Sequence, residues 1–256
     1  MRSQLLIAAI FFLPFIAKTQ NNPPAFSAGQ LQQDYEIFVR ALKEAHPGLY
    51  RYTSKQSFDS IFEATSKRVD HVMTEEEFYK LLMPVIADIK CGHTKWHRAN
   101  RPDDRYPFHS DSLFPLKLYF DGDKAYVLYS YGDATTIRPS MEIQSINGKP
   151  VSSIIRELHQ YITIDGNVQS ALYEELNHSF NGYFATFIGT STSYNVIYKD
   201  GNNLLSTFLP AVKLATIQKR DSLEKPVHRL PLRLSYPSPN IAMLTIENFY
   251  VDKKEQ

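Results

Sequence analysis

The sequence has one cysteine, Cys91, among 256 residues, so it can form no internal disulfide and packing must stabilise the fold. Glycine is scarce, with 10 residues, which does not favour a glycine-rich phosphate-binding protein. Neither sign of charge dominates, because 28 lysines and arginines stand against 27 aspartates and glutamates, and no basic stripe is present. A nucleic-acid partner is therefore not expected.

Beyond the N-terminus, the sequence has no apolar run of the roughly 20 residues that a membrane span requires. Residues 1–19 are typical of a secretory signal peptide, with Arg2, a short apolar run from Leu5 to Ile16 and small residues before Gln20. We therefore expect export to the periplasm or the extracellular space, without stable membrane insertion.

The composition, with 43% apolar and 21% charged residues, is normal for a globular protein with a core. Apolar residues recur at helical spacing in the first part of the chain, which predicts helices at about 27–46, 57–69 and 74–89. The third helix has the clearest signal, because Thr74 and Glu77 form a capping box before an i, i+3, i+4 apolar stripe. Pro84 lies inside this helix and predicts a kink.

The second part of the chain is typical of strands, after a polar, proline-containing stretch at 101–112 that is expected to be a linker. Strands are expected at 114–120 and 125–131, at 143–147, at 194–198 and 204–209, and at 230–236 and 241–246, with helices at 151–162 and 167–180. The fold class expected is therefore α+β, with a helical region followed by a β-rich domain.

Gly92 and His93 stand where the third helix gives way to the strands. Gly92 is expected to end the helix in the left-handed region, which only glycine enters without a side-chain penalty. His93 would then be presented at a junction from which an imidazole can project into a cleft. A chemical role and a structural hydrogen-bonding role are both open at this point.

The residues around His93 suggest two other chemistries. His97 follows at the i, i+4 spacing of a zinc helix, but the glutamate of H-E-x-x-H is missing, and in an extended segment the two backbones would lie about 13 Å apart. No metal is therefore expected. Cys91 and His93 share a strand face as a thiol and its base would, although a buried, inert cysteine is the preferred interpretation.

Four segments together resemble the tail-specific, or C-terminal-processing, serine peptidases, particularly their tricorn-like branch. They are the segments HPGLYRY at 46–52, IKCGHT at 89–94, the run 114–149 and IAMLTIENF at 241–249. The resemblance implies a helical region at 20–100 that ends in the Gly-His motif, the linker, a PDZ-like domain at 113–217 and, from residue 226, the first strands of an incomplete catalytic α/β domain.

The resemblance also implies that His93 is the general base toward a serine nucleophile. In that family the serine, the oxyanion donors and the supporting acidic residue follow the strand that starts here at Ile241, and no G-x-S-x-G elbow occurs in this sequence. We therefore expect an exported serine-type peptidase that cleaves peptides or unfolded protein tails without a cofactor. The chain, lacking the nucleophile-bearing half, is expected to be inactive alone.

A PDZ-like domain implies a peptide-binding loop, here around Leu113, Phe114 and Leu116. Pro115 has no amide to donate and no glycine is near, which disfavours carboxylate capture and leaves strand addition at a sheet edge open. The rival to a peptidase is therefore a non-catalytic, exported peptide-binding module. The open strand edge at 241–249 further predicts self-association.

Overall fold

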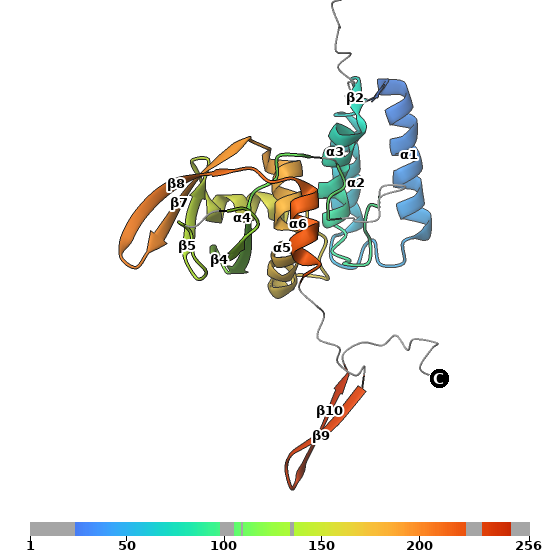
Figure 1. Cartoon of the computed structure of the whole chain (residues 1–256). Helices are drawn as coiled ribbons and strands as arrows, with labels where there is room; N and C mark the ends of the chain where they lie inside the picture. Colours follow the sequence, from blue (N-terminus) through green and yellow to red (C-terminus); the bar gives the residue numbers. More distant parts are fainter. Residues whose placement is uncertain (1–23, 98–104, 109, 134–135, 224–231, 247–256) are drawn as a thin grey trace, which may run out of the picture. The chain divides into compact units, whose positions relative to one another are not determined.

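The protein was analysed as a computed structural model, which describes residues 24–97, 105–108, 110–133, 136–223 and 232–246 (Figure 1). The signal peptide expected at 1–19 lies outside these residues. The chain divides into two compact units, the first comprising Met1–Phe108 and Ser152–His178 and the second His109–Val151 and Ser179–Gln256. The mixture of helices with antiparallel sheets confirms the α+β class. None of the described helices is long and apolar enough to cross a membrane.

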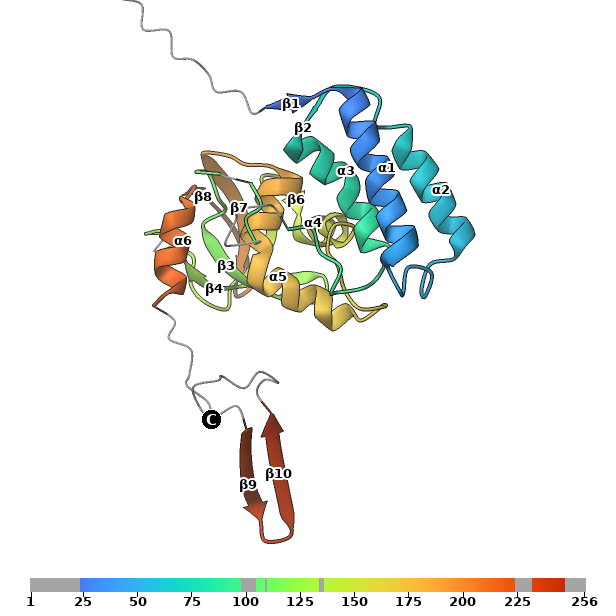
Figure 2. The same cartoon turned by 90° about the vertical axis from the view of Figure 1, so that its right-hand side faces the viewer.

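Helices dominate the first unit. They are α1 (Ala28–Ala45), α2 (Lys55–Ser66), α3 (Glu75–Ala87), α4 (Val151–His159) and the greater part of α5 (Gln169–Tyr183), with the short strands β1 (Ala25–Phe26) and β2 (Met73–Thr74) paired antiparallel. Helices α1, α2 and α3 lie side by side in both views (Figures 1 and 2). Capping boxes of Ser27 with Gln30 and of Thr74 with Glu77 begin α1 and α3, so the predicted start of α3 is confirmed.

Two apolar clusters hold these helices together, as the helical spacing predicted. Their buried members are Leu31, Tyr35, Val69, Met73, Phe78, Leu81 and Leu82 in one cluster, and Leu42, Leu49, Phe58, Phe62, Val85 and Ile89 in the other. Helices α1 and α3 contribute to both clusters. The connection from α1 to α2 is anchored by buried Leu49, which fixes the residues around it against the end of α3.

The end of α3 differs from the sequence-based expectation. The helix ends at Ala87, and Lys90, not Gly92, takes the left-handed conformation, with φ 56°. The Lys90 amide donates to the Ala87 carbonyl at 2.9 Å, so the chain already turns at Lys90, two residues before the glycine. The prediction that Gly92 is the left-handed helix stop is therefore wrong, while the kink at Pro84 stays a prediction.

The second unit contains an antiparallel sheet in the order β3-β4-β5-β7-β8. Its strands are β3 (Leu116–Asp121), β4 (Lys124–Ser130), β5 (Glu142–Ile146), β7 (Ser193–Asp200) and β8 (Asn203–Pro210), with β6 (Lys149–Pro150) paired to β5. Both hairpins expected from the sequence are present. A π-helical turn, η1 (Phe184–Ile188), extends α5, and α6 (Leu214–Asp221) follows the sheet. Helix α6 was not predicted, because only Ile217 on it is buried and its sequence has little apolar periodicity.

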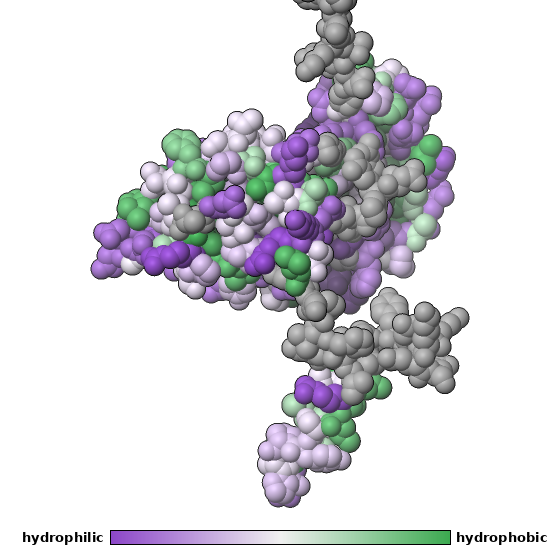
Figure 3. Space-filling view, viewed as in Figure 1, coloured by the Kyte–Doolittle hydropathy of each residue, from purple (hydrophilic) through white to green (hydrophobic). Residues whose placement is uncertain are grey.

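The last described segment is a hairpin of β9 (Leu232–Ser238) and β10 (Ile241–Ile246), which confirms the two strands expected there. Its apolar side chains are exposed (Figure 3). They are Leu232, Leu234, Tyr236, Ile241, Met243, Leu244 and Ile246. Leu234 and Leu244 are cross-strand partners and therefore share one face of the hairpin.

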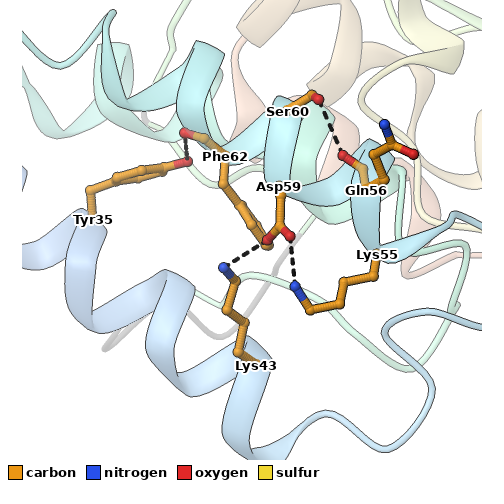
Figure 4. A network of polar contacts seen from close by, with 7 residues as sticks. All are labelled: Tyr35, Lys43, Lys55, Gln56, Asp59, Ser60 and Phe62. Carbon is orange, nitrogen blue, oxygen red and sulfur yellow. Dashed lines mark hydrogen bonds and ion pairs between the residues drawn. The ribbon is translucent and has the colours of Figure 1, made fainter.

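A buried tyrosine joins α1 to α2. The Tyr35 hydroxyl donates to the Phe62 carbonyl at 2.8 Å, and burial raises the pKa of Tyr35 to about 12 (Figure 4). Near it, Asp59 accepts from Lys55 at 2.7 Å and from Lys43 at 2.9 Å, and these bonds lower the pKa of the Asp59 carboxyl. Because the ion pairs are exposed, the Tyr35 bond is the stronger tie between the two helices.

We expect Tyr35→Phe to lower the free energy of unfolding by about 1 kcal/mol near neutral pH, because it removes the buried hydrogen bond from the Tyr35 hydroxyl to the Phe62 carbonyl. In the parent chain, the unfolded state ionises Tyr35 near pH 10 while the folded state resists until about pH 12. Stability should therefore fall between these pH values, and the difference between the two proteins should shrink. Urea unfolding followed by circular dichroism at several pH values measures this; Tyr50→Phe, at an exposed tyrosine, is the control. A constant difference from pH 8 to pH 12 would contradict the assignment.

Candidate functional site

A pocket of about 930 Å³ lies within the first unit. Three segments line it: residues 46–52 between α1 and α2, residues 89–94 after α3, and Asp165 from the connection between α4 and α5. The first two of these segments are among the four that resemble tail-specific peptidases. The pocket is thus lined by residues that are far apart in the sequence.

His93 lines this pocket with an exposed side chain. Within the described part of the chain, no protein group is hydrogen-bonded to its ring. An exposed imidazole on a pocket wall is free to meet a ligand, which a structural histidine with both nitrogens bonded would not be. The geometry is compatible with the predicted base, and the catalytic role itself stays a prediction.

His46 holds the segment that carries His93. Its Nδ1 accepts the Gly48 amide at 3.2 Å, so the proton resides on Nε2, which donates to the Thr94 hydroxyl at 2.8 Å. The Thr94 amide in turn donates to the Cys91 carbonyl at 2.9 Å, closing a turn around His93. His46 therefore has a structural, hydrogen-bonding role, and its only signal in the sequence is the segment HPG.

Asp165 reaches the same place from the connection between α4 and α5. Its Oδ1 accepts the Gly92 amide at 2.8 Å, across 73 positions of sequence. Two further bonds fix the connection: the Gly166 amide donates to the Lys90 carbonyl at 2.9 Å, and Lys90 Nζ donates to Asn167 Oδ1 at 2.8 Å. The sequence analysis missed Asp165, because its only local signal is an Asp-Gly pair typical of a turn.

Two glycines make this approach sterically feasible. A Cβ at position 92 would lie 3.4 Å from the Asp165 carboxylate, so Gly92 leaves room for that group. Gly166 has φ +59°, a region that side chains disfavour, and a Cβ there would lie 3.2 Å from the Tyr52 ring. Gly92 is thus used for close approach and hydrogen bonding, while Gly166 supplies the unusual backbone conformation.

The donor atoms of Cys91, His93 and Asp165 all lie within 4.8 Å of one another. Cys91 is half-buried, and the other two side chains are exposed. A carboxylate beside an imidazole stabilises the protonated ring, which supports proton transfer. A thiol, an imidazole and a carboxylate together are also a set of metal ligands. His97, weighed as a second ligand from the sequence, is not part of this group.

Leu113, Phe114 and Leu116, expected to bind substrate, belong to the second unit and are buried there. Phe114 packs on Phe180, Phe184 and Tyr194, and the carbonyls of Phe114 and Leu116 accept the Asn181 side chain. The Leu113 amide is also occupied, by the Val212 carbonyl at 2.9 Å. These side chains form core, and a peptide-binding role for the loop stays a prediction.

No protein-family model and no curated protein matches the sequence. Among solved structures, a point mutant of CPAF is similar to 72% of this chain and 34% of its own, at 13% identity and a TM-score of 0.51. Mature CPAF, alone and complexed with lactacystin, is similar to 75% of the chain at 13% identity, with TM-scores of 0.46 and 0.47. The chain spans between 34% and 38% of these proteins. At such identity, the likeness to the first structure shows the fold alone.

We expect Gly166→Ala to destabilise the chain by more than about 1 kcal/mol, because alanine is strained in the left-handed region and its Cβ meets Tyr52. In a Tyr52→Ala background the same substitution should cost less, since the ring is gone and only the backbone strain remains. Chemical unfolding of the four proteins of this double-mutant cycle measures the difference. Equal costs in both backgrounds would show that the Tyr52 ring does not restrict a side chain at position 166.

Proposed function

We propose that this chain supplies the general base and the substrate pocket of an exported serine peptidase of the tail-specific, tricorn-like kind, which cleaves peptides or unfolded protein tails. The observation that carries the proposal is the exposed His93 imidazole on the wall of a pocket of about 930 Å³. A general base must reach both the nucleophile and the substrate, and a free imidazole facing an open pocket meets that requirement.

Two further observations support the proposal. The segment that carries His93 is held on both sides, by the bond from His46 to Thr94 and by the bond from Gly92 to Asp165, as a base of fixed orientation requires. CPAF, to 34% of which this chain is similar in fold, is a chlamydial serine protease of the tail-specific-protease-like kind. That likeness concerns the fold, and the chemistry rests on His93 and its surroundings.

In this mechanism, His93 takes the proton of a serine hydroxyl while the serine oxygen attacks the substrate carbonyl, and the imidazolium then protonates the leaving amine. The Asp165 carboxylate lies in the same pocket, with an oxygen within 4.8 Å of a ring nitrogen of His93. The serine and its oxyanion donors are assigned to residues beyond β10, where the family places them, since this sequence has no G-x-S-x-G elbow.

A fluorophosphonate probe, which labels activated serines, tests this assignment. The 256-residue chain should stay unlabelled, because acyl transfer needs a nucleophile, a base and an oxyanion hole in one site. A chain continued past Gln256 along its reading frame should be labelled, and His93→Ala should slow labelling by at least about a thousandfold.

His178→Ala, at an exposed imidazole on α5, is the matched control and should leave labelling unchanged. Labelling of the short chain, abolished by His93→Ala, would reveal a nucleophile among its own serines. If the continued chain is not labelled, or is labelled equally without His93, the peptidase proposal fails.

The rival function is a non-catalytic, exported peptide-binding module. One observation favours it: β8 is an edge strand of the sheet, and Leu204, Leu205 and Phe208 on it are exposed. An extended peptide could add a strand to such an edge. This function becomes the better supported one if the continued chain shows no activated serine.

The exposed hairpin β9–β10 leads us to propose self-association of the isolated chain. Replacing the cross-strand pair Leu234 and Leu244 by lysine should shift sedimentation toward the monomer, because it charges one apolar face. The control replaces Val72 and Val168, which are equally exposed elsewhere, by lysine and adds the same charge. An equal shift in both variants would assign the effect to net charge.

A further inference from the structure

The proposed peptidase mechanism uses His93 and leaves the thiol beside it unexplained. Cys91 is half-buried in the same pocket, and its Sγ, a ring nitrogen of His93 and a carboxylate oxygen of Asp165 lie within 4.8 Å of one another. All three residues belong to the first unit, so the grouping depends only on contacts within that unit. A serine peptidase requires no thiol beside its base.

We propose that Cys91, His93 and Asp165 form a binding site for a zinc ion. Zinc is bound by thiolate, imidazole and carboxylate at about 2.0–2.3 Å, and tetrahedral coordination places such ligands roughly 3.5 Å apart. Ligand atoms within 4.8 Å reach that spacing through small side-chain rotations, and the exposed side chain of His93 has room for such a rotation. The thiolate selects against magnesium and calcium, which prefer oxygen ligands alone.

The backbone already positions the ligands that come from distant parts of the chain. The Gly92 amide holds Asp165 Oδ1 at 2.8 Å, which leaves the other carboxylate oxygen for the ion. Such a second bond to a ligating carboxylate orients it and strengthens binding. Cys91 and His93 stand two residues apart, on either side of that same glycine. The bond from Gly92 to Asp165, together with the two bonds of Lys90 to the same connection, therefore brings all three ligands together.

The pocket completes the site. Three protein ligands would leave a fourth zinc position open, and Cys91, His93 and Asp165 line a cavity of about 930 Å³ that can admit water or a small ligand. Binding converts the Cys91 thiol to a thiolate: the S–H bond breaks, a sulfur–zinc bond forms and one proton passes to solvent. The sequence placed only His97 at ligand spacing from His93, because the third ligand lies 72 positions further along the chain.

The experiment titrates the reduced 256-residue chain with Co²⁺ and then with Zn²⁺. Cobalt bound through Cys91 should give the near-ultraviolet charge-transfer band of a cobalt–thiolate bond, and Zn²⁺ should remove it. Because Cys91 is the only cysteine, no other residue can produce this band.

Zn²⁺ should also slow the alkylation of Cys91 by iodoacetamide, which intact-mass measurement monitors. This second measurement needs no substitution. Neither readout requires peptidase activity, so the zinc-site proposal can fail or succeed independently of the proposed function.

Three substitutions test the ligand set. Cys91→Ser should abolish the charge-transfer band, and His93→Ala and Asp165→Asn should each weaken binding at least about tenfold. Asp165→Asn keeps an acceptor for the Gly92 amide, so its effect reports the lost charge and not a displaced loop. His71→Ala is the control, because His71 pairs with Asp70 at 2.6 Å without a thiol nearby. Cobalt binding without the thiolate band, unprotected alkylation, or an unchanged affinity in Asp165→Asn would overturn the proposal.

Discussion

The hydrogen bond from the Gly92 amide to the Asp165 carboxylate is the interaction on which the candidate site depends. Two bonds of Lys90, with Gly166 and with Asn167, also tie the connection between α4 and α5 to the segment after α3, but this bond is the one that brings the carboxylate of Asp165 beside Cys91 and His93. A Cβ at position 92 would lie 3.4 Å from the carboxylate, at the limit of ordinary van der Waals contact, so glycine leaves the most room there. The backbone amide of Gly92 thus contributes to the choice of the chemical groups that share the pocket.

The sequence predicted the features whose causes are local. Thr74 and Glu77 are three residues apart, so their capping box could be recognised without the structure. The turn at Gly122 likewise joins two strands that are neighbours in sequence. Because these signals are local, the start of α3, the β3–β4 hairpin and the α+β fold class agree with the predictions from the sequence. The sequence does not predict helix α6, because this helix buries one side chain and therefore has no periodic pattern of apolar residues.

The contents of the site could not be predicted, because they depend on contacts between distant segments. Gly92 was recognised as important and given the wrong physical role, since a left-handed helix stop and a close approach both require glycine. Leu113, Phe114 and Leu116 were assigned by resemblance, whereas their apolar character already favoured the core in which Phe114 and its aromatic neighbours lie. The sequence thus identifies residues that matter for the site, and the structure shows which physical role each of them has.

His93 cannot serve as a base and as a ligand at one time, because both uses need the same imidazole lone pair. Proton transfer requires only the imidazole and a nearby negative charge. Metal binding requires the thiol as well, and Cys91 is the group that a serine mechanism leaves without a purpose. The two states are therefore alternative occupancies of one pocket, and the free zinc concentration relative to its dissociation constant determines which one is populated. A pocket built this way would lose its base whenever zinc is bound.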